Sequence, residues 1–333
     1  MPNKLNVPDL WTPTMGRVVD KQNELASDAY VTGQSIADMR VAYNYERLFW
    51  NEGGPQPHSI RNDSIATSFG SVKVRMYRPT DAKTLPAIIY IHGGGLVLGG
   101  LDTHDRITRK LADASGAAVI AVDYTLSPEA KFPQAIQECA SVYQALKINH
   151  LEWGIDPQDI SFAGDSGGAY LSCATYLWLR DEHGLGAIAR SLLLFYGAYG
   201  LRDSASMRLL GGPWDGLSEE DYAWYMGLYR SNDSDFDSPY YNIVGADLTQ
   251  KFPPSFIAAA ALDPLRDDSR TLNAMLAEHG TLTTYTEVPG VIHGFLHHGR
   301  MLDEANDLLE QAGAFFSNER AAEPYLPKES HKE

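Results

Sequence analysis

Cysteine is scarce in this chain of 333 residues, which contains only Cys139 and Cys173, both within apolar, helix-like stretches. One pair of cysteines cannot build the disulfide framework of a small secreted domain, so we expect two buried, reduced thiols. The N-terminal residues lack the apolar core of a signal peptide, and no apolar run approaches the length needed to cross a bilayer. We therefore expect a cytoplasmic protein.

Positive charge is also in short supply, because 27 Lys and Arg residues face 43 Asp and Glu residues, giving a net charge of −16. An acidic surface repels nucleic acids and anionic membranes, which excludes both as main partners. Internal repeats and low-complexity tracts are lacking too. Since no spacing of histidines and cysteines is typical of a metal site, we expect no metal.

What the sequence does contain is an alternation of apolar, strand-like runs with amphipathic, helix-like segments from Leu85 onward. An earlier stretch, 72–77, alternates with a period of two residues, as in a strand with one solvated face. The later runs are 87–91, 117–122, 160–163, 191–195, 256–262 and 283–288. Buried strands separated by helices predict an α/β fold with a mostly parallel sheet covered by helices on both faces.

Two segments depart from this alternation. Residues 1–50 have helical patterning with several aromatic residues, and residues 200–245 or so are rich in Trp and Tyr but contain no core strand. We expect these segments to form a small helical cap over the carboxyl ends of the strands, where open α/β sheets bind ligands. The cap and the core would make one domain spanning residues 1–333.

A chemical motif, Gly164-Asp165-Ser166-Gly167-Gly168, lies between the strand-like run 160–163 and a helix-like stretch, 169–180. A serine on a sharp turn from strand to helix has its hydroxyl exposed at the end of the sheet, and the flanking glycines let the backbones pass closely. Upstream, His92-Gly93-Gly94-Gly95 follows the run 87–91 and offers bare backbone N–H groups for an oxyanion hole. Together the two motifs predict a serine hydrolase with Ser166 as its nucleophile.

A serine nucleophile needs an imidazole base that is oriented by a carboxylate, and in α/β hydrolases the chain order is Ser, acid, His. Asp263 directly follows the run 256–262, and His293 follows the run 283–288, so we assign them as acid and base.

The alternatives for these two roles lie close by. Asp267 and Asp268 fall in the first turn of a helix, where acidic residues stabilise the helix dipole. His297 and His298 fall at an apparent helix start beyond the loop. His92 fits better as a residue that shapes the glycine loop, because a base should be oriented by an acid.

The same five residues surround the nucleophile of chymotrypsin-like proteases, which makes these proteases an alternative class. Those enzymes are antiparallel β-barrels with the order His, Asp, Ser, and they usually contain disulfides. The alternation of strands and helices, the downstream acid and base, and the two cysteines all disagree with that class.

The remaining motif residues have supporting roles in this interpretation. We expect the N–H groups of Gly93, Gly94 and Gly167 to form the oxyanion hole, and His92 and Gly95 to shape the loop. For Asp165 we favour hydrogen bonds to neighbouring backbone over contact with substrate. Glu129 either braces the serine turn through a hydrogen bond or is a satisfied loop carboxylate without effect on rate.

Taken together, the motifs resemble those of the hormone-sensitive-lipase-like esterases over residues 43–316 or so, nearly the whole chain. The resemblance implies an α/β-hydrolase fold and a cofactor-free carboxylesterase for short-chain acyl esters. The family usually has Ala where this chain has Gly167. That glycine keeps the N–H of the oxyanion hole but holds it less rigidly. The motifs that carry the resemblance are His92–Gly95, Gly164–Gly168, Asp123–Glu129, Asp263–Asp268 and His293–Phe295.

Three further segments, 45–50, 101–106 and 209–217, are more narrowly similar to the acetyl esterases of enterobacteria. By resemblance alone, this similarity implies a homodimer and a regulatory protein partner, the activator of the maltose regulon. A regulatory or binding protein on the same scaffold is therefore the second class of function. The presence of Ser166, Asp263 and His293 favours an enzyme.

Overall fold

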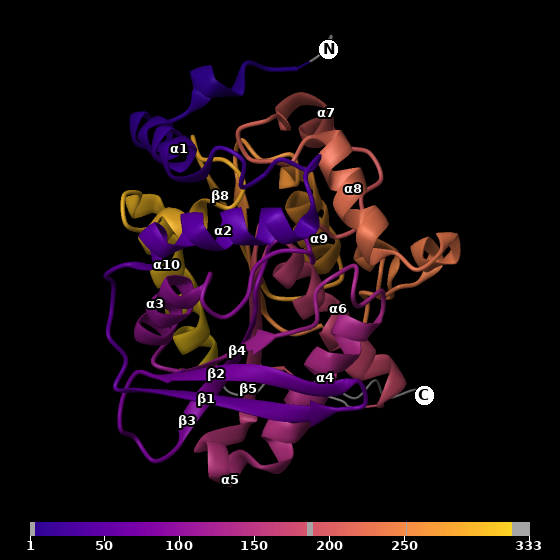
Figure 1. Ribbon diagram of the computed structural model, residues 1–333. Coiled ribbons are helices and arrows are strands. Elements are labelled where there is room, and N and C mark those ends of the chain that lie inside the picture. The colour runs from indigo at the N-terminus through magenta and orange to yellow at the C-terminus, as the bar shows by residue number, and fades with distance from the viewer. Residues whose placement is uncertain (1–3, 185–188, 251, 322–333) are drawn as a thin grey trace.

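The computed structural model describes residues 4–184, 189–250 and 252–321, and the first three residues of the predicted cap lie outside these ranges. Eight strands form one sheet in the order β1-β2-β4-β3-β5-β6-β7-β8 (Figure 1). The strands are β1 (Ser59–Thr67), β2 (Gly70–Arg78), β3 (Leu85–Ile91), β4 (Ala118–Asp123), β5 (Ile155–Asp165), β6 (Leu192–Phe195), β7 (Ser255–Ala260) and β8 (Thr283–Val288).

The sheet is mostly parallel, as predicted. Strands β3 to β8 pair in parallel, whereas β2 pairs antiparallel with both β1 and β4. In the centre, Ile89 of β3 lies in register with Ile120 of β4 and with Phe162 of β5. Strand β1 was not predicted. It is an edge strand with Ile65 as its only buried residue, so its sequence lacks the apolar pattern of the core strands.

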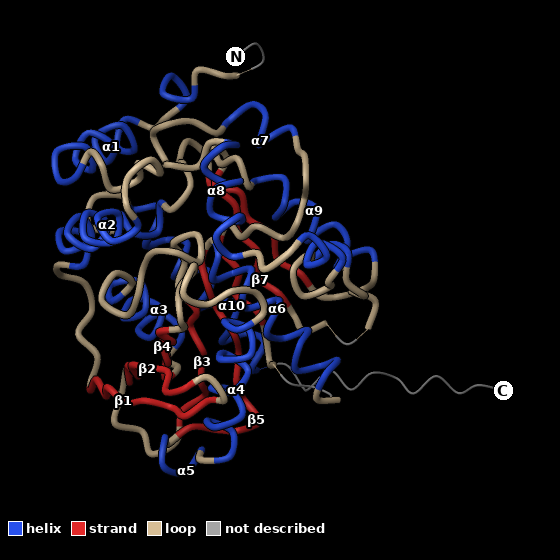
Figure 2. Tube along the Cα trace, turned by 45° about the vertical axis from the view of Figure 1, so that its right-hand side comes forward, coloured by secondary structure: helices blue, strands red, loops and turns tan. Residues whose placement is uncertain are grey.

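Helices cover both faces of the sheet, and Figure 2 shows the strands enclosed between them. The α-helices are α1 (Pro13–Ala26), α2 (Ile36–Asn51), α3 (Asp105–Ser115), α4 (Gln134–Ile148), α5 (His150–Trp153), α6 (Gly167–Glu182), α7 (Ala205–Leu210), α8 (Glu219–Tyr229), α9 (Arg266–Glu278) and α10 (Asp303–Ala321). Short 3₁₀ helices are η1 (Val7–Leu10), η2 (Asp233–Asp237), η3 (Ile243–Gly245) and η4 (Phe295–His298).

The core consists of two main layers because side chains along a strand alternate between its faces. Ile89 and Ile91 of β3 pack in the layer under α4, α6 and α9, and Ile88 and Tyr90 pack in the layer under α3 and α10. All seven residues of β3 are buried, as expected for a central parallel strand. Cys139 in α4 and Cys173 in α6 are buried free thiols, as predicted.

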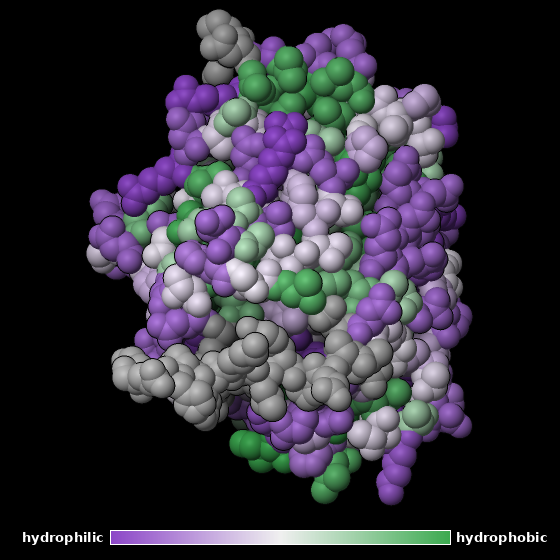
Figure 3. All heavy atoms as spheres, turned by 180° about the vertical axis from the view of Figure 1, so that it is seen from behind, coloured by the Kyte–Doolittle hydropathy of each residue, from purple (hydrophilic) through white to green (hydrophobic). Residues whose placement is uncertain are grey.

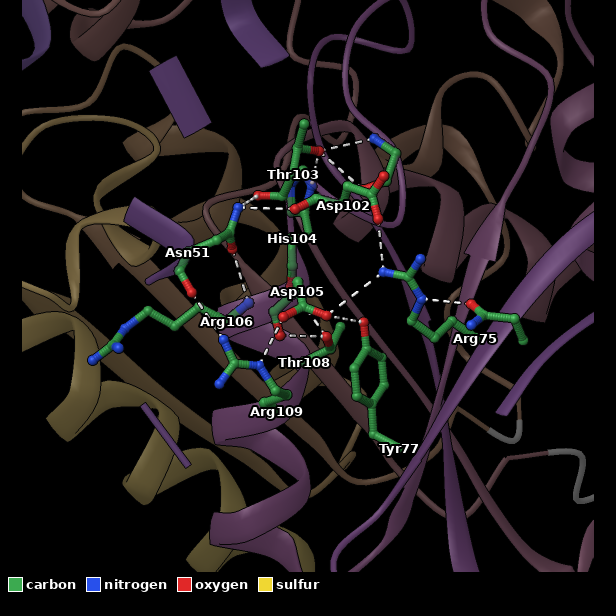
Figure 4. Close-up of polar contacts among 12 residues, drawn as sticks. Asn51, Arg75, Tyr77, Asp102, Thr103, His104, Asp105, Arg106, Thr108 and Arg109 are labelled. Carbon is green, nitrogen blue, oxygen red and sulfur yellow. Dashed lines mark hydrogen bonds and ion pairs between the residues drawn. The ribbon is translucent and has the colours of Figure 1, made fainter. Parts of the chain in front are cut away.

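The helices α1, α2, α7 and α8, here called the cap helices, lie together at one end of the molecule (Figure 1). The end of α2 is tied to the start of α3. Asn51 donates from Nδ2 to the carbonyl oxygen of Asp102 at 2.9 Å, and its Oδ1 accepts the N–H of Arg106 at 2.9 Å. Arg109 donates to the carbonyl oxygen of Asn51 at 2.9 Å and to Asp105 at 2.7 Å (Figure 4). These contacts fix α2 against the body of the protein.

In the described parts of the chain, no helix combines the length and apolarity that crossing a bilayer requires. The face seen in Figure 3 is largely hydrophilic, with separate apolar patches near its two ends. This distribution agrees with the excess of acidic residues in the sequence.

The tightest packing constraint in the fold gives a test. Gly168 is so close to the end of β3 that a Cβ atom there would overlap the carbonyl oxygen of Ile91. Gly168→Ala should therefore destabilise the protein by about 3 kcal/mol or more, because the backbone must shift.

The measurement is urea denaturation followed by circular dichroism. Gly16→Ala in α1 is the matched control, since the nearest atom to a Cβ there is 3.9 Å away and alanine favours helix. Equal stability of the two variants would contradict this account of the packing.

Candidate active site

The turn that carries Ser166 is strained and closely packed. Strand β5 ends at Asp165, α6 begins at Gly167, and Ser166 between them adopts φ 51° and ψ −122°. This conformation is unusual for a residue with a side chain and persists only where the surroundings hold it. The N–H of Ser166 donates to the carbonyl oxygen of Phe195 in β6 at 2.8 Å. The turn is thereby anchored in the sheet.

The structure brings Ser166, His293 and Asp263 together from three separate loops. His293 Nε2 lies 2.8 Å from Ser166 Oγ, and His293 Nδ1 lies 2.7 Å from Asp263 Oδ2. A carboxylate can only accept, so Nδ1 carries the proton and Nε2 of the neutral ring accepts from the serine hydroxyl. Asp263 is fully buried, and its Oδ1 accepts the N–H of Leu265 at 2.7 Å. Both carboxylate oxygens are therefore fixed.

The surroundings of His293 favour a proton on its ring. Burial alone would lower the pKa of His293, but the charge of Asp263 and its hydrogen bond raise this pKa above its ordinary value. The ring is more basic than usual, and its Nε2 carries no proton in the resting state. Both properties suit the transfer of a proton from the serine hydroxyl to Nε2.

The alternative residues for acid and base lie elsewhere. Asp268 Oδ1 accepts the N–H groups of Tyr199, Gly200 and Leu201 at 2.7, 3.1 and 3.2 Å. Asp267 accepts the N–H of Ser206 at 2.8 Å. Both carboxylates thus hold the chain that follows β6, a role beyond the dipole effect expected from the sequence.

The two other histidines of this region lack the arrangement of a base. His297 and His298 are 5% and 1% exposed in η4, and burial together with the nearby Arg47 charge lowers the pKa of each well below the ordinary value. His92 donates from Nδ1 to the carbonyl oxygen of Gly93 at 2.8 Å and stacks on Tyr124, so it lies in the glycine loop as expected.

The glycine loop requires one correction. Gly93 was predicted to donate to an oxyanion, but its N–H donates to Asp165 Oδ1 at 3.0 Å and so is already engaged. Within the described ranges, the N–H groups of Gly94 and Gly95 have no intramolecular partner, and both residues line the cavity at Ser166. The free donors near Ser166 are therefore Gly94, Gly95 and Gly167, whose N–H at the start of α6 has no intrahelical acceptor.

Gly167 packs against the side chain of Leu96. A Cβ atom at Gly167 would lie 3.3 Å from Leu96 Cδ2 and 3.4 Å from the Leu96 nitrogen, slightly closer than ordinary contact. Leu96 itself has φ 67° and is 2% exposed. The space that an alanine methyl group would occupy in this chain is thus partly filled by a leucine of the glycine loop.

Asp165 is a hub for hydrogen bonds behind Ser166. Its Oδ1 accepts from Tyr90 Oη at 2.7 Å and from Gly93 N–H at 3.0 Å, and it lies 3.4 Å from His104 Nε2. Burial alone would raise the pKa of Asp165, but the neighbouring His104 and these hydrogen bonds lower it to about 2. Ligand atoms of His104, Asp165 and His297 lie within 4.8 Å of one another, as a metal site would require. Because Asp165 Oδ1 already has these partners, we interpret the cluster as a hydrogen-bonded support for the turn.

Glu129 contacts a cap helix, whereas the sequence offered the serine turn as one possibility. Its carboxylate pairs with Arg40 of α2 at 2.7 and 2.8 Å and is largely exposed. Arg40 also donates to the carbonyl oxygens of Val97 and Ser127, both at 2.9 Å. Glu129 therefore holds Arg40, which in turn links α2 to the segment that follows the glycine loop.

Two cavities meet at Ser166 and share the lining residues Gly95, Leu217 and Tyr225. The smaller cavity has a volume of about 70 Å³ and is also lined by His293 and by residues of α1 and α2. The larger has a volume of about 490 Å³ and extends beneath α7 and α8. Ser166 thus lies between a small cavity and a large one.

Sequence reasoning missed three polar residues that line the smaller cavity, namely Gln22, Arg47 and Asp215. Of the three, only Arg47 had a signal in the sequence, because Glu46 and Arg47 are adjacent opposite charges among the aromatic residues Tyr45, Phe49 and Trp50. Glu46 and Arg47 are 0% and 3% exposed and form an ion pair.

Comparison with known proteins now places the chain in a class. A family model described as the alpha/beta hydrolase fold matches residues 88–297, and the chain belongs to this family of α/β hydrolases. Within the family, its similarity is to esterases of the hormone-sensitive-lipase-like kind.

Three solved structures illustrate the likeness. A hyperthermophilic esterase from the archaeon Pyrobaculum calidifontis is 30% identical, with 94% of this chain and 100% of that chain covered and a TM-score of 0.87. An ester hydrolase from the metagenome of Lake Arreo is 28% identical, with the same coverage and a TM-score of 0.86. A thermophilic carboxylesterase from a metagenomic library is also 28% identical, with 86% and 98% covered and a TM-score of 0.82.

The hub at Asp165 yields a prediction for stability. Asp165→Asn should cost about 1–3 kcal/mol at neutral pH, because the buried donors of Tyr90 and Gly93 lose a charged acceptor. Since the folded protein lowers the pKa of Asp165 below its ordinary 3.8, the ionised carboxylate contributes stability above that value and loses it as the pH falls towards 2.

Urea denaturation of both proteins between pH 7 and pH 3 measures this difference, which should shrink on the acid side. Asp113→Asn, on the exposed side of α3, is the control and should change stability by less than about 0.5 kcal/mol. If the Asp165→Asn variant were as stable as the wild-type protein, the supporting role assigned to Asp165 would be wrong.

Proposed function

We propose that this protein is a carboxylesterase that hydrolyses short-chain acyl esters through Ser166, His293 and Asp263. The observation that carries the proposal is the pair of contacts on His293, 2.8 Å to the serine hydroxyl and 2.7 Å to the buried carboxylate. The membership of the chain in a family of α/β hydrolases, among esterases, supports it.

In the first half of the reaction, Ser166 Oγ attacks the ester carbonyl carbon while His293 Nε2 takes the hydroxyl proton. Asp263 holds the ring in the tautomer with the proton on Nδ1 and stabilises the imidazolium. The N–H groups of Gly94, Gly95 and Gly167 are the donors for the oxyanion. When the tetrahedral intermediate collapses, the bond to the alcohol oxygen breaks and His293 gives its proton to the leaving alcohol.

In the second half, a water molecule attacks the acyl-enzyme. His293 takes a proton from that water, a second tetrahedral intermediate forms, and its collapse returns the proton to Ser166 Oγ. The carboxylic acid is released and the enzyme is restored. Every proton in this cycle passes through one nitrogen atom, Nε2 of His293.

The two cavities support a short acyl group. We assign the acyl group to the smaller cavity and the alcohol to the larger one, since a volume of about 70 Å³ admits only a few heavy atoms. Among unsubstituted acyl groups, acetyl is the one that this assignment favours. The homodimer, the regulatory partner and the cytoplasmic location stay predictions from the sequence.

Substitution of the three residues tests the mechanism. Ser166→Ala should lower kcat for p-nitrophenyl acetate by at least about 10⁴-fold, and Asp263→Asn by on the order of 10⁴-fold, because the imidazole would take the wrong tautomer.

Asp267→Asn is the matched control for the acid and should retain most activity, since Asp267 holds the chain at Ser206. Circular dichroism verifies that each variant is folded. If Asp267→Asn proved more damaging than Asp263→Asn, the assignment of the acid would be wrong.

The length of the acyl chain tests the assignment of the cavities. Across p-nitrophenyl acetate, butyrate and octanoate, kcat/KM should fall by about tenfold or more at the longest chain, because the smaller cavity cannot hold it. Acetates of progressively longer alcohols should not show this fall. A rise in rate with acyl length would place the acyl group in the larger cavity.

A further inference from the structure

The smaller cavity has a polar wall, although an acetyl group offers it nothing polar beyond the reacting ester. Gln22 of α1 and Arg47 of α2 line it and are 7% and 3% exposed. Asp215, in the loop before α8, lines it as well. Gln22 Oε1, Arg47 Nε and Asp215 Oδ2 are buried atoms without a hydrogen-bond partner among the described residues, and the same holds for Trp214 Nε1 on the same cavity.

Other contacts orient these side chains. Arg47 donates from Nη2 to Tyr30 Oη at 2.7 Å and pairs with Glu46 through Nη1, while its guanidinium lies 4.4 Å from the ring centroid of Tyr43. Gln22 donates from Nε2 to the same Tyr30 Oη at 3.3 Å. The amide and the guanidinium are thus joined through one hydroxyl, and one polar atom of each is left over.

Asp215 is held in a similar way. Its Oδ1 accepts the N–H of Leu217 at 3.2 Å, which leaves Oδ2 without a partner. Burial raises the pKa of Asp215 to about 7, although the charge of His293 opposes this rise. The carboxyl group therefore lies within electrostatic reach of the histidine that we assign as the base.

The three atoms of Gln22, Arg47 and Asp215 without a partner, two oxygens and one N–H, select the chemistry of a ligand. A carboxylate on the ligand can only accept, so it could not satisfy Asp215 Oδ2 or Gln22 Oε1, and an ammonium group can only donate, so it could not satisfy Arg47 Nε. An alkyl group would leave all three polar atoms unsatisfied in a buried space, which is unfavourable. A hydroxyl group both donates and accepts, so it can donate a hydrogen bond to Asp215 Oδ2 or Gln22 Oε1 and accept one from Arg47 Nε.

We propose that the group entering the smaller cavity carries a hydroxyl, so that the preferred substrates are esters of short hydroxycarboxylic acids. This inference rests on the proposed function and narrows its substrate class. The bonds made and broken are those of the same ester hydrolysis, in which water supplies a proton to the alcohol and a hydroxyl to the acid. The hydroxyl of the acyl group takes no part in these steps and only orients the acyl chain.

The test compares two esters that differ by one hydroxyl. The ratio of kcat/KM for p-nitrophenyl 3-hydroxybutyrate to that for p-nitrophenyl butyrate should be at least about tenfold in favour of the hydroxylated ester. In Gln22→Leu and in Asp215→Leu this ratio should fall towards one. Gln144→Leu in α4, away from both cavities, is the matched control and should keep the wild-type ratio.

The outcomes separate the two proposals. If wild-type protein fails to hydrolyse p-nitrophenyl acetate, the proposed function itself fails. If it hydrolyses the simple esters with a ratio near one, only the preference for a hydroxyl is overturned.

A second series, 2-hydroxyethyl acetate against ethyl acetate, decides on which side of the ester the hydroxyl lies. A preference in this series alone, lost in Gln22→Leu, would overturn the hydroxy-acid class and place a hydroxylated alcohol in the cavity.

Discussion

The close approach of the β5–α6 turn to the end of β3 is the constraint on which the site depends. Gly164 and Gly168 have no room for a Cβ atom, because carbonyl oxygens of Gly168 and Ile91 occupy that space. With the backbones in contact, Asp165 reaches across to the N–H of Gly93 at 3.0 Å. One carboxylate thereby links the glycine loop directly to the nucleophile turn, which helps to keep the N–H donors of the loop beside Ser166.

The hydrogen bond to Asp165 also distinguishes Gly93 from the two glycines that follow it. The N–H of Gly93 donates to Asp165, whereas Gly94 and Gly95 line the cavity and their N–H groups have no partner among the described residues. Any residue except proline could donate an N–H here, so the run of three glycines follows from lack of space. A Cβ atom would lie 2.5 Å from Asp165 Oδ2 at Gly93, would overlap the carbonyl oxygen of Leu98 at Gly94, and would lie 2.6 Å from the ring of Tyr225 at Gly95.

Much of this site could be predicted from the sequence, because the motifs lie at strand ends that the alternation of apolar runs also locates. Ser166, Asp263 and His293 each follow such a run within five residues, and they do lie together. The role of Gly93 could not be predicted, since its partner is 72 residues away and several acceptors were conceivable. Strand β1 escaped prediction because an exposed edge needs no apolar pattern.

The polar residues of the smaller cavity escaped prediction for a different reason. Gln22, Arg47 and Asp215 come from three cap segments whose relative placement depends on tertiary contacts such as those of Asn51 and Arg40. A buried ion pair like Glu46–Arg47 is costly to desolvate and is a poor source of stability. Arg47 lies at the wall of a cavity beside the nucleophile, and its Nε has no partner among the described residues, which argues that Arg47 sets the chemistry of what enters there. On this reasoning the core of the fold positions the residues that carry out the reaction, and the cap determines which ester is bound.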